Sequence, residues 1–437
     1  MSRTIIANSS IVTCDEANSV LRGASVSIDG GLITAVSAGP LEARPGDVVI
    51  DARGGIVLPG LVNAHAHLAM TLLRGVADST DLDAFLATLL PLEGALINAD
   101  AVVTGAELAG VELLRSGCTA ALDMYFFPGS AATATARVGL AVHNGPVFIE
   151  FPGPDDFAWP ERLAWARRYL QDQAAGARWV CPHSTYLLSE DQLRAVAALA
   201  DETGARVHVH AAETTAELAQ VAARHAGRTP VQVLADVGLL HDRAVLAHAV
   251  HVTDRDIDLI ARSGAHVSHN PASNAKLASG LAPVRRMLDA GVNVALGTDG
   301  ASSANDLDLW MAMRLASFLP SIMHGDPGEI TADDVVRMAT INGAKALGTG
   351  STHGSIEVGK VADLVVLDGR SAALTPSYDA TSTLAFSASR ADVLHVFAAG
   401  AHLVDGGVVV TVPVDLHDRV AVQAERVTGL RRMGGGS

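Results

Sequence analysis

The sequence predicts an α/β chain: a (β/α)8 TIM barrel with a small β-sandwich domain formed by both chain ends. Three observations support this fold class. Apolar runs alternate with helix-like segments through the middle of the chain, and eight such runs can be counted. Both ends carry short β-prone runs punctuated by glycine. Residues suited to catalysis stand where the apolar runs stop, and active sites of such barrels lie at the C-terminal ends of the strands.

The eight candidate strands share an apolar character and a polar or glycine-containing end. They are GLVNAHAH (60–67), TAALDMYF (119–126), GLAVHNGPVFIEF (139–151), RWVCPHSTYL (178–187), RVHVHAAE (206–213), AVLAHAVH (244–251), AHVSHNPAS (265–273) and NVALGTDG (293–300). The segments between them show helical spacing. In EDQLRAVAALADETG the stripe of Leu193, Val196, Ala197 and Ala200 stops at Gly204, which predicts a helix and its end.

The outer runs are expected to pair with each other. At the front these are 4–13, 25–37 and 47–60, and at the back 362–368, 393–404 and 406–412. The predicted organisation is a first part of a composite β-sandwich (1–58), a metal-dependent barrel (59–354), the second part of the sandwich (355–412), and a C-terminal helix with a flexible GGGS tail (413–437).

Composition narrows the choice of partners and compartment. The net charge of −16 argues against nucleic acid, because phosphate backbones select basic surfaces. Cys14, Cys118 and Cys181 are odd in number and far apart, so no disulfide framework is expected and a reducing cytoplasm is predicted. No signal-peptide core and no apolar run of about 18 residues is present, so no membrane partner is expected.

Five metal-binding side chains are spaced as if each closes a strand: His65, His67, His210, His248 and Asp299. His65 and His67 are two residues apart, so a strand points both to one face. Imidazole with carboxylate suits a divalent zinc- or iron-like ion. A metal held in this way with a position open for water is a hydrolase site, so a bound divalent metal is predicted.

Single positions leave alternatives open. His208 repeats the two-residue spacing, but His210 lies nearer the strand end and is preferred as the ligand; likewise His248 is preferred over His251. Glu213 is a candidate acid–base group, or else a charge at a helix N-terminus. Considered alone, Asp299 fits a turn residue and His269 an ordinary loop histidine. Their joint placement at strand ends favours the catalytic interpretation.

Several motifs together resemble the amidohydrolase superfamily. They are PGLVNAHAHLAMTLLRG, PHSTYL, HVHAAE, LAHAVH, SHNPASNAKLASGLAPVRRMLDAG and LGTDGASSANDLDLWMAMRLAS. The resemblance covers nearly the whole chain. It is greatest to the branch of S-adenosylhomocysteine and methylthioadenosine deaminases and their near relatives, which include triazine hydrolases.

The resemblance implies a role for each position. The implied metal ligands are His65, His67, His210, His248 and Asp299. Glu213 matches the proton shuttle, His269 matches the residue that orients the hydroxide together with Asp299, and His183 matches a residue facing the substrate ring. Binuclear relatives carry a carboxylated lysine in the fourth strand. RWVCPHSTYL has no lysine, so a single divalent metal per subunit is implied, zinc by default with iron as the alternative.

The implied reaction is hydrolytic deamination of a 6-aminopurine nucleoside to the inosine-type product and ammonia. Metal binding lowers the pKa of water towards about 7. Asp299 and His269 are expected to aim the attacking group at C6 of the ring, and His248 to lie near the oxygen that adds there. Glu213 is expected to move a proton to the ring nitrogen N1.

Substrate contacts are expected in two segments. In 81–96, Glu93 matches a glutamate that holds ribose hydroxyls, and Phe85 stands where the branch has tryptophan. The leucines beside Phe85 are expected to pack inside the protein rather than touch substrate; they are Leu82, Leu86, Leu89 and Leu90.

After the third strand, relatives that bind an amino-acid tail place arginines. Here Pro146 stands near the first position and Arg162 near the second, with Trp159 close by. Arg162 and Trp159 are the predicted contacts to the 5′ group. The missing first arginine favours a neutral 5′ group, as in methylthioadenosine or adenosine.

Three alternatives remain. One is another aminohydrolase reaction, on aminofutalosine, a pterin, guanine or 8-oxoguanine. A second is hydrolytic displacement on a triazine. A third is a non-catalytic assembly protein, which retention of every ligand disfavours. The family also implies a homo-oligomer, a dimer or tetramer.

Overall fold

The barrel strands occupy the positions that the sequence predicts, and every pairing between them is parallel. The computed structural model describes residues 3–434. In that range the barrel strands are β6 (Leu61–His67), β7 (Cys118–Asp123), β8 (Ala141–Asn144), β9 (Val147–Phe148), β10 (Trp179–Pro182), β11 (Arg206–Ala211), β12 (Ala244–His248), β13 (His266–His269), β14 (Asn293–Leu296) and β15 (Asp299–Gly300). The predicted (β/α)8 barrel is confirmed.

Two predicted strands are bent, which the sequence analysis did not anticipate. The third run divides into β8 and β9, and the eighth into β14 and β15, so the ring consists of a six-stranded and a four-stranded arc. Glycine stands at both bends because nothing larger fits. A Cβ on Gly145 would lie 1.9 Å from the Trp179 carbonyl oxygen, and one on Gly297 would lie 2.3 Å from Asn270 Oδ1. Chain continuity at the bends closes the barrel.

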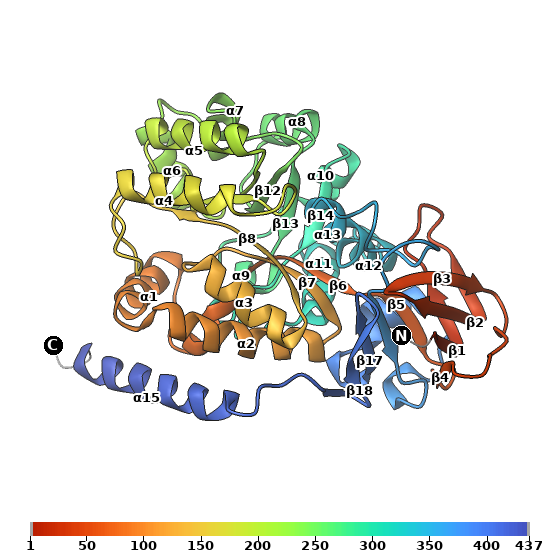
Figure 1. Cartoon of the computed structure of the whole chain (residues 1–437). Helices are drawn as coiled ribbons and strands as arrows, with labels where there is room; N and C mark the ends of the chain where they lie inside the picture. The colour runs from red at the N-terminus through yellow and green to blue at the C-terminus, as the bar shows by residue number, and fades with distance from the viewer. Residues whose placement is uncertain (1–2, 435–437) are drawn as a thin grey trace.

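Helices surround the ring (Figure 1). Their bounds are α1 (Leu82–Leu96), α2 (Ala99–Arg115), α3 (Pro128–Val138), α4 (Trp159–Gln171), α5 (Glu190–Thr203), α6 (Thr215–Arg224), α7 (Pro230–Asp236), α8 (Asp254–Ser263), α9 (Pro271–Lys276), α10 (Val284–Asp289), α11 (Leu309–His324), α12 (Ala332–Met338), α13 (Ile341–Ala346), α14 (Ala380–Ser382) and α15 (Leu416–Gly434). The predicted end of α5 is confirmed, since Gly204 caps it with a left-handed φ of 67°. Its start carries a Ser189–Gln192 capping box.

Strands from the two ends of the chain share one nine-stranded sheet. They are β1 (Thr4–Val12), β2 (Val20–Asp29), β3 (Leu32–Ser37), β4 (Val48–Asp51), β5 (Ile56–Pro59), β16 (Leu364–Leu367), β17 (Val393–Ala398), β18 (Ala401–Asp405) and β19 (Val408–Val409). β5 joins the ends, because it pairs with β1 and, antiparallel, with β16. Figure 1 shows the red and blue strands lying side by side. The domain limits at 58/59, 354/355 and 412/413 stay predictions.

The last helix, α15, lies along the outside of the barrel against α1 and α2 (Figure 1). Arg426 Nη2 donates to the Leu96 carbonyl at the end of α1 at 3.4 Å, and Arg419 pairs with Glu107 of α2. Residues 435–437 of the predicted GGGS tail lie outside the described residues. Within residues 3–434, no single helix has the length and apolarity needed to cross a membrane. Helices α1 and α2 pass that test only as a pair, and the chain bends by 117° between them.

Candidate active site

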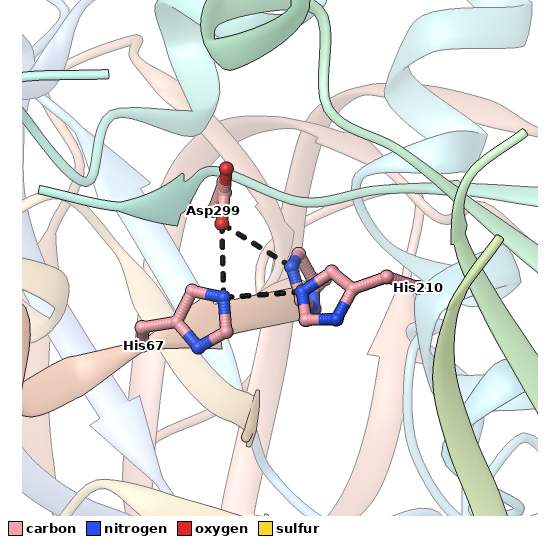
Figure 2. A group of neighbouring side chains, drawn as sticks. His67, His210 and Asp299 are labelled. Carbon is pink, nitrogen blue, oxygen red and sulfur yellow. Dashed lines mark hydrogen bonds and ion pairs between the residues drawn. The ribbon is translucent and has the colours of Figure 1, made fainter. Parts of the chain in front are cut away.

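Four of the predicted metal ligands meet at the carboxyl ends of β6 and β11 and at the start of β15, which continues the eighth barrel strand after β14. Asp299 Oδ1 lies 3.1 Å from His67 Nε2 and 3.3 Å from His65 Nε2. His210 Nε2 lies 3.3 Å from His67 Nε2. Figure 2 shows the rings of His67 and His210 turned towards each other beneath the carboxylate of Asp299. All four side chains are buried, so their donor atoms face one shared point away from bulk water.

In two of these histidines, the ring nitrogen that points away from the cluster, Nδ1, is held by a backbone carbonyl. His67 Nδ1 lies 2.6 Å from the Met124 carbonyl oxygen, and His210 Nδ1 lies 2.8 Å from the His183 carbonyl oxygen. A carbonyl oxygen only accepts, so each Nδ1 carries the proton and donates. The lone pair is therefore on Nε2, which is the arrangement that metal-ligating histidines adopt.

His65 has a histidine behind it instead of a carbonyl. Its Nδ1 lies 2.8 Å from His208 Nε2, which places His208 outside the cluster and explains the repeated two-residue spacing. His65 Nε2 is buried and has no hydrogen-bond partner of good geometry among the described residues, although Asp299 is near. A buried nitrogen aimed at a carboxylate and two further imidazoles suits a cation between them.

Asp299 is held in place by two serines that the sequence analysis missed. Its Oδ2 accepts hydrogen bonds from Ser273 Oγ at 2.6 Å and Ser303 Oγ at 2.8 Å, which leaves Oδ1 facing the histidines. Asp299 has a left-handed φ of 62°, a strained conformation that clusters at functional sites. The available signal was the serines of GTDGASS and SHNPASN, close in sequence to two candidate residues.

The charges of the cluster fit a divalent metal. Burial lowers the pKa of His67, but the Asp299 carboxylate outweighs burial and raises that pKa to about 9. Burial raises the pKa of Asp299, yet the neighbouring imidazoles of His65 and His67 outweigh burial and hold that pKa well below its usual value. The cluster therefore attracts positive charge. Three imidazole nitrogens and one carboxylate oxygen are donors that suit zinc or iron.

His248, the fifth predicted ligand, lies beside this four-atom group rather than within it. Its Nδ1 lies 2.9 Å from Asn274 Oδ1, and its Nε2 is 3.7 Å from Glu213 Oε2. Its ring centroid is 5.5 Å from that of His210. The residue has a left-handed φ of 76° at the end of β12. Its role as a ligand stays a prediction.

Glu213 lies just past β11 and lines the same cavity as His67 and His210. Burial raises the pKa of its carboxyl, which helps the group to take up a proton. Ser279 Oγ is 3.5 Å from its Oε1.

A second glutamate, Glu217, holds the backbone that carries Glu213. Its buried carboxylate accepts from the amide of Glu213 at 2.6 Å and from that of Ala212 at 3.1 Å. Ala212 has a left-handed φ of 56°, so these two bonds stabilise a strained turn. The sequence analysis missed Glu217. The signal was a second glutamate four residues after Glu213, in ETTAE.

His183 and His269, two further predicted site residues, differ in their surroundings. His183 lines the cavity, with its ring centroid 4.6 Å from that of His210. His269 ends β13 and is buried, and neither ring nitrogen has a hydrogen-bond partner among the described residues. The catalytic roles of both stay predictions.

The cavity in front of the cluster has a volume of about 370 Å³. Glu93 lines it and accepts a hydrogen bond from the Tyr125 hydroxyl, and Phe85 of the same helix also lines it. Of the neighbouring leucines, Leu82 and Leu86 pack against the core as expected and also line the cavity, whereas Leu90 lines the cavity and is exposed. Leu89 is fully buried in the core, as predicted.

Arg162 and Trp159 do not line the cavity, which corrects their prediction as substrate contacts. The guanidinium of Arg162 is buried and bound to both oxygens of Asp155, at 2.6 and 2.7 Å. Trp159 packs against Phe148, with ring centroids 6.1 Å apart. Both residues begin α4, whose orientation turns them towards the protein interior.

Comparison with known proteins agrees with this geometry. The model of the amidohydrolase family matches residues 56–403. The chain is 41% identical over 399 residues to the 5′-deoxyadenosine deaminase of Methanothermobacter thermautotrophicus, covering 90% of this chain and 91% of that protein. It is 45% identical over 377 residues to the 5-methylthioadenosine/S-adenosylhomocysteine deaminase of Halobacterium salinarum, covering 85% and 86%.

A solved structure shows the same fold with a metal. The crystal structure of an adenosine deaminase from Xanthomonas campestris, with bound zinc, superimposes with a TM-score of 0.92. It is 33% identical in sequence and covers 98% of this chain and 99% of that chain. From the extent of these matches, the chain belongs to the amidohydrolase family.

Proposed function

We propose that the protein is a zinc-dependent deaminase of adenine nucleosides whose 5′ group is small and uncharged, such as 5′-deoxyadenosine and methylthioadenosine. The observation that carries the proposal is the chemistry of the cavity: the metal-binding cluster lies at one end, and apolar side chains line the other. The relatives named above act, by their names, on 5′-deoxyadenosine, methylthioadenosine or S-adenosylhomocysteine.

The charge of the cavity lining supports the choice of 5′ group. Among the described lining residues there is no arginine or lysine, and the charged side chains are carboxylates, including Asp156 near the apolar end. The tail of S-adenosylhomocysteine carries a carboxylate, and nothing in this lining would pair with it. Phe126, Ile149 and Phe151 offer instead an apolar surface for a methyl or methylthio group.

The ribose is assigned to Glu93. A carboxylate accepts several hydrogen bonds, and Tyr125 occupies only part of that capacity. The buried position of Glu93 makes an unpaired charge costly, so two ribose hydroxyls are well suited as donors.

The cluster His65, His67, His210 and Asp299 would hold the metal, which when bound lowers the pKa of water towards neutrality. Glu213 would take one proton from the attacking water and deliver it to N1 of the purine. The C6–O bond forms, the C6–N bond breaks, and a second proton leaves with the amino group as ammonia. Glu217 would keep the Glu213 carboxyl aimed into the cavity by holding the turn that carries it.

Zinc is proposed over iron because it is the usual ion of hydrolases with this donor set. A homo-oligomer stays a prediction. So does a cytoplasmic location, which is compatible with three cysteines that are all free and buried.

The test is ultraviolet-monitored deamination by zinc-loaded protein. We expect turnover of 5′-deoxyadenosine and methylthioadenosine, slower turnover of adenosine, and the lowest kcat/KM for S-adenosylhomocysteine. Guanine and a chlorotriazine serve as controls for the alternative reactions. A preference for S-adenosylhomocysteine would contradict the 5′ assignment. Inactivity on every adenine nucleoside by metal-loaded protein would contradict the reaction itself.

A further inference from the structure

A second group of metal-binding side chains lies in the terminal sheet, on the hairpin of β17 and β18. His395 Nδ1 is 3.1 Å from His402 Nε2 and 3.2 Å from Asp405 Oδ1, and His402 Nε2 is 3.9 Å from the same oxygen. We propose that His395, His402 and Asp405 form a second site for a zinc-like divalent ion, distinct from the barrel cluster.

The spacing of the three donor atoms fits one central ion. Zinc bonds of about 2.0–2.2 Å in tetrahedral geometry place neighbouring donor atoms about 3.3–3.6 Å apart. Two of the observed distances, 3.1 and 3.2 Å, are slightly shorter and the third, 3.9 Å, is slightly longer. A small rotation of the exposed Asp405 carboxylate would bring the two distances that it makes, 3.2 and 3.9 Å, towards this range. Two imidazoles also select zinc-like ions over magnesium or calcium, which prefer oxygen ligands.

The hairpin fixes the two rings before any ion binds. His395 and Phe397 are two apart in β17, so they face the same side of the sheet. His402 is the direct cross-strand partner of Phe397, and its ring stacks on the phenyl ring at 4.5 Å with an interplanar angle of 15°. This stacking holds His402 beside His395, and Asp405 ends the same strand.

The site is open to solvent, so water can complete the coordination. The exposed fractions of the side chains are 12% for His395, 31% for His402 and 62% for Asp405. The guanidinium of Arg53 lies nearby and disfavours a cation, but it is paired with Asp368 at 3.2 Å. The greater exposure of His402 and Asp405 and the neighbouring positive charge give a weaker site than the buried barrel cluster.

An ion here would link the two strands of the hairpin near one edge of the nine-stranded sheet, whose outermost strand is β19. It would stabilise this edge without touching the cavity, because the ligands of the two sites belong to different sheets. The proposal is therefore independent of the substrate and of the reaction.

The experiment titrates zinc into the full-length protein that already holds its tightly bound metal, and counts additional ions by calorimetry and elemental analysis. Wild type is expected to bind one further zinc ion and to gain thermal stability from it. His402→Ala should lose the additional binding and the zinc-dependent rise in Tm while keeping wild-type deaminase activity. The matched control is His353→Ala, since His353 is also 31% exposed and lies outside the hairpin.

A second, milder variant keeps the test valid if His402→Ala does not fold properly. Asp405→Asn keeps the size of an exposed side chain and is expected to weaken the additional binding at least about tenfold by removing the anionic ligand. The proposal would be overturned if wild type bound no zinc beyond the metal that it already holds. It would also be overturned if the additional zinc still bound to both His402→Ala and Asp405→Asn.

Discussion

The two ends of the cavity come from different parts of the chain. The metal-binding end consists of residues at strand ends, whose side chains are buried and held by second hydrogen bonds, as in Asp299 with Ser273 and Ser303. The apolar end consists of α1 and the segment 149–154, where Leu90 and Phe151 are 44% and 41% exposed and rest on van der Waals contact.

This difference suggests that the metal-binding end carries out the reaction and that the apolar end selects the substrate. Oriented hydrogen bonds fix the metal-binding end to a narrow geometry, so small changes there should affect rate or metal content severely. The apolar end only needs to match the shape and charge of the substrate. Changes there should therefore alter KM and the preference among substrates while the reaction continues. The predictions below test this separation in order of expected effect.

Loss of one metal ligand should be the most severe change. His210→Ala removes a donor whose Nδ1 is fixed by the His183 carbonyl, and it should lose both the metal and detectable turnover. Metal content after dialysis and the rate of deamination are measured together. His251→Ala is the control, because His251 bonds the Ser279 carbonyl and does not line the cavity. Retention of full metal content by His210→Ala would remove His210 from the ligand set.

Glu213→Gln should separate metal binding from proton transfer. The amide keeps the size of the side chain but cannot shuttle a proton, so kcat should fall about 10²–10⁴-fold with the metal retained. Single-turnover kinetics and metal analysis provide the measurement. A variant with more than a tenth of the wild-type rate would contradict the proposed role of Glu213.

The serines that hold Asp299 should matter less than the ligands themselves. Ser273→Ala removes one of the two donors to Oδ2, and metal affinity should fall about 10–100-fold. Competition with a chelator gives the affinity, and Ser303→Ala should act in the same direction. Unchanged affinity in the double variant would show that the strained backbone alone orients the carboxylate.

A charge at the apolar end should change preference without stopping the reaction. Phe151→Arg places a cation where the lining has none, so relative kcat/KM for S-adenosylhomocysteine over methylthioadenosine should rise about tenfold, equivalent to about 1.4 kcal/mol. Phe318→Arg, at a similarly exposed site on α11, is the control. Loss of activity on both substrates would mean that the two ends of the cavity are not separable.

The smallest effect should be on the pH dependence of stability. Burial raises the pKa of Glu217 from 4.5 to about 7. Between these two pH values the folded protein therefore holds a proton that the unfolded chain releases. This contribution to stability is present below pH 4.5 and is lost as the pH rises through about 7. Glu217→Gln cannot titrate, so its midpoint of chemical denaturation should fall less between pH 4.5 and 7.5. Parallel profiles for the variant and wild type would contradict this.

Periodicity and strand-end residues were enough to predict the barrel, because a repeating pattern of apolar runs has few solutions. The bends at Gly145 and Gly297 were not predictable in this way. They depend on atoms from distant segments, such as the Trp179 carbonyl, that approach the glycines only in the folded barrel.

The same limit applies to the site. The ligand positions followed from motif and strand register, whereas the contacts of Arg162 depended on where Asp155 lies after folding. The apolar stripe of α1 showed which face was hydrophobic, but a stripe does not reveal whether that face meets the core or a cavity. Leu86 and Leu89 lie three residues apart on the same side of the helix, yet Leu86 lines the cavity and Leu89 is fully buried in the core.

The pairing of β5 with β16 also has a consequence during synthesis on the ribosome. β5 precedes the barrel and β16 follows it, so one edge of β5 has no partner until the entire barrel has been translated. An unpaired apolar strand edge is a site of misassembly in a nascent chain. We therefore expect newly made protein to depend on chaperones until its C-terminal strands emerge.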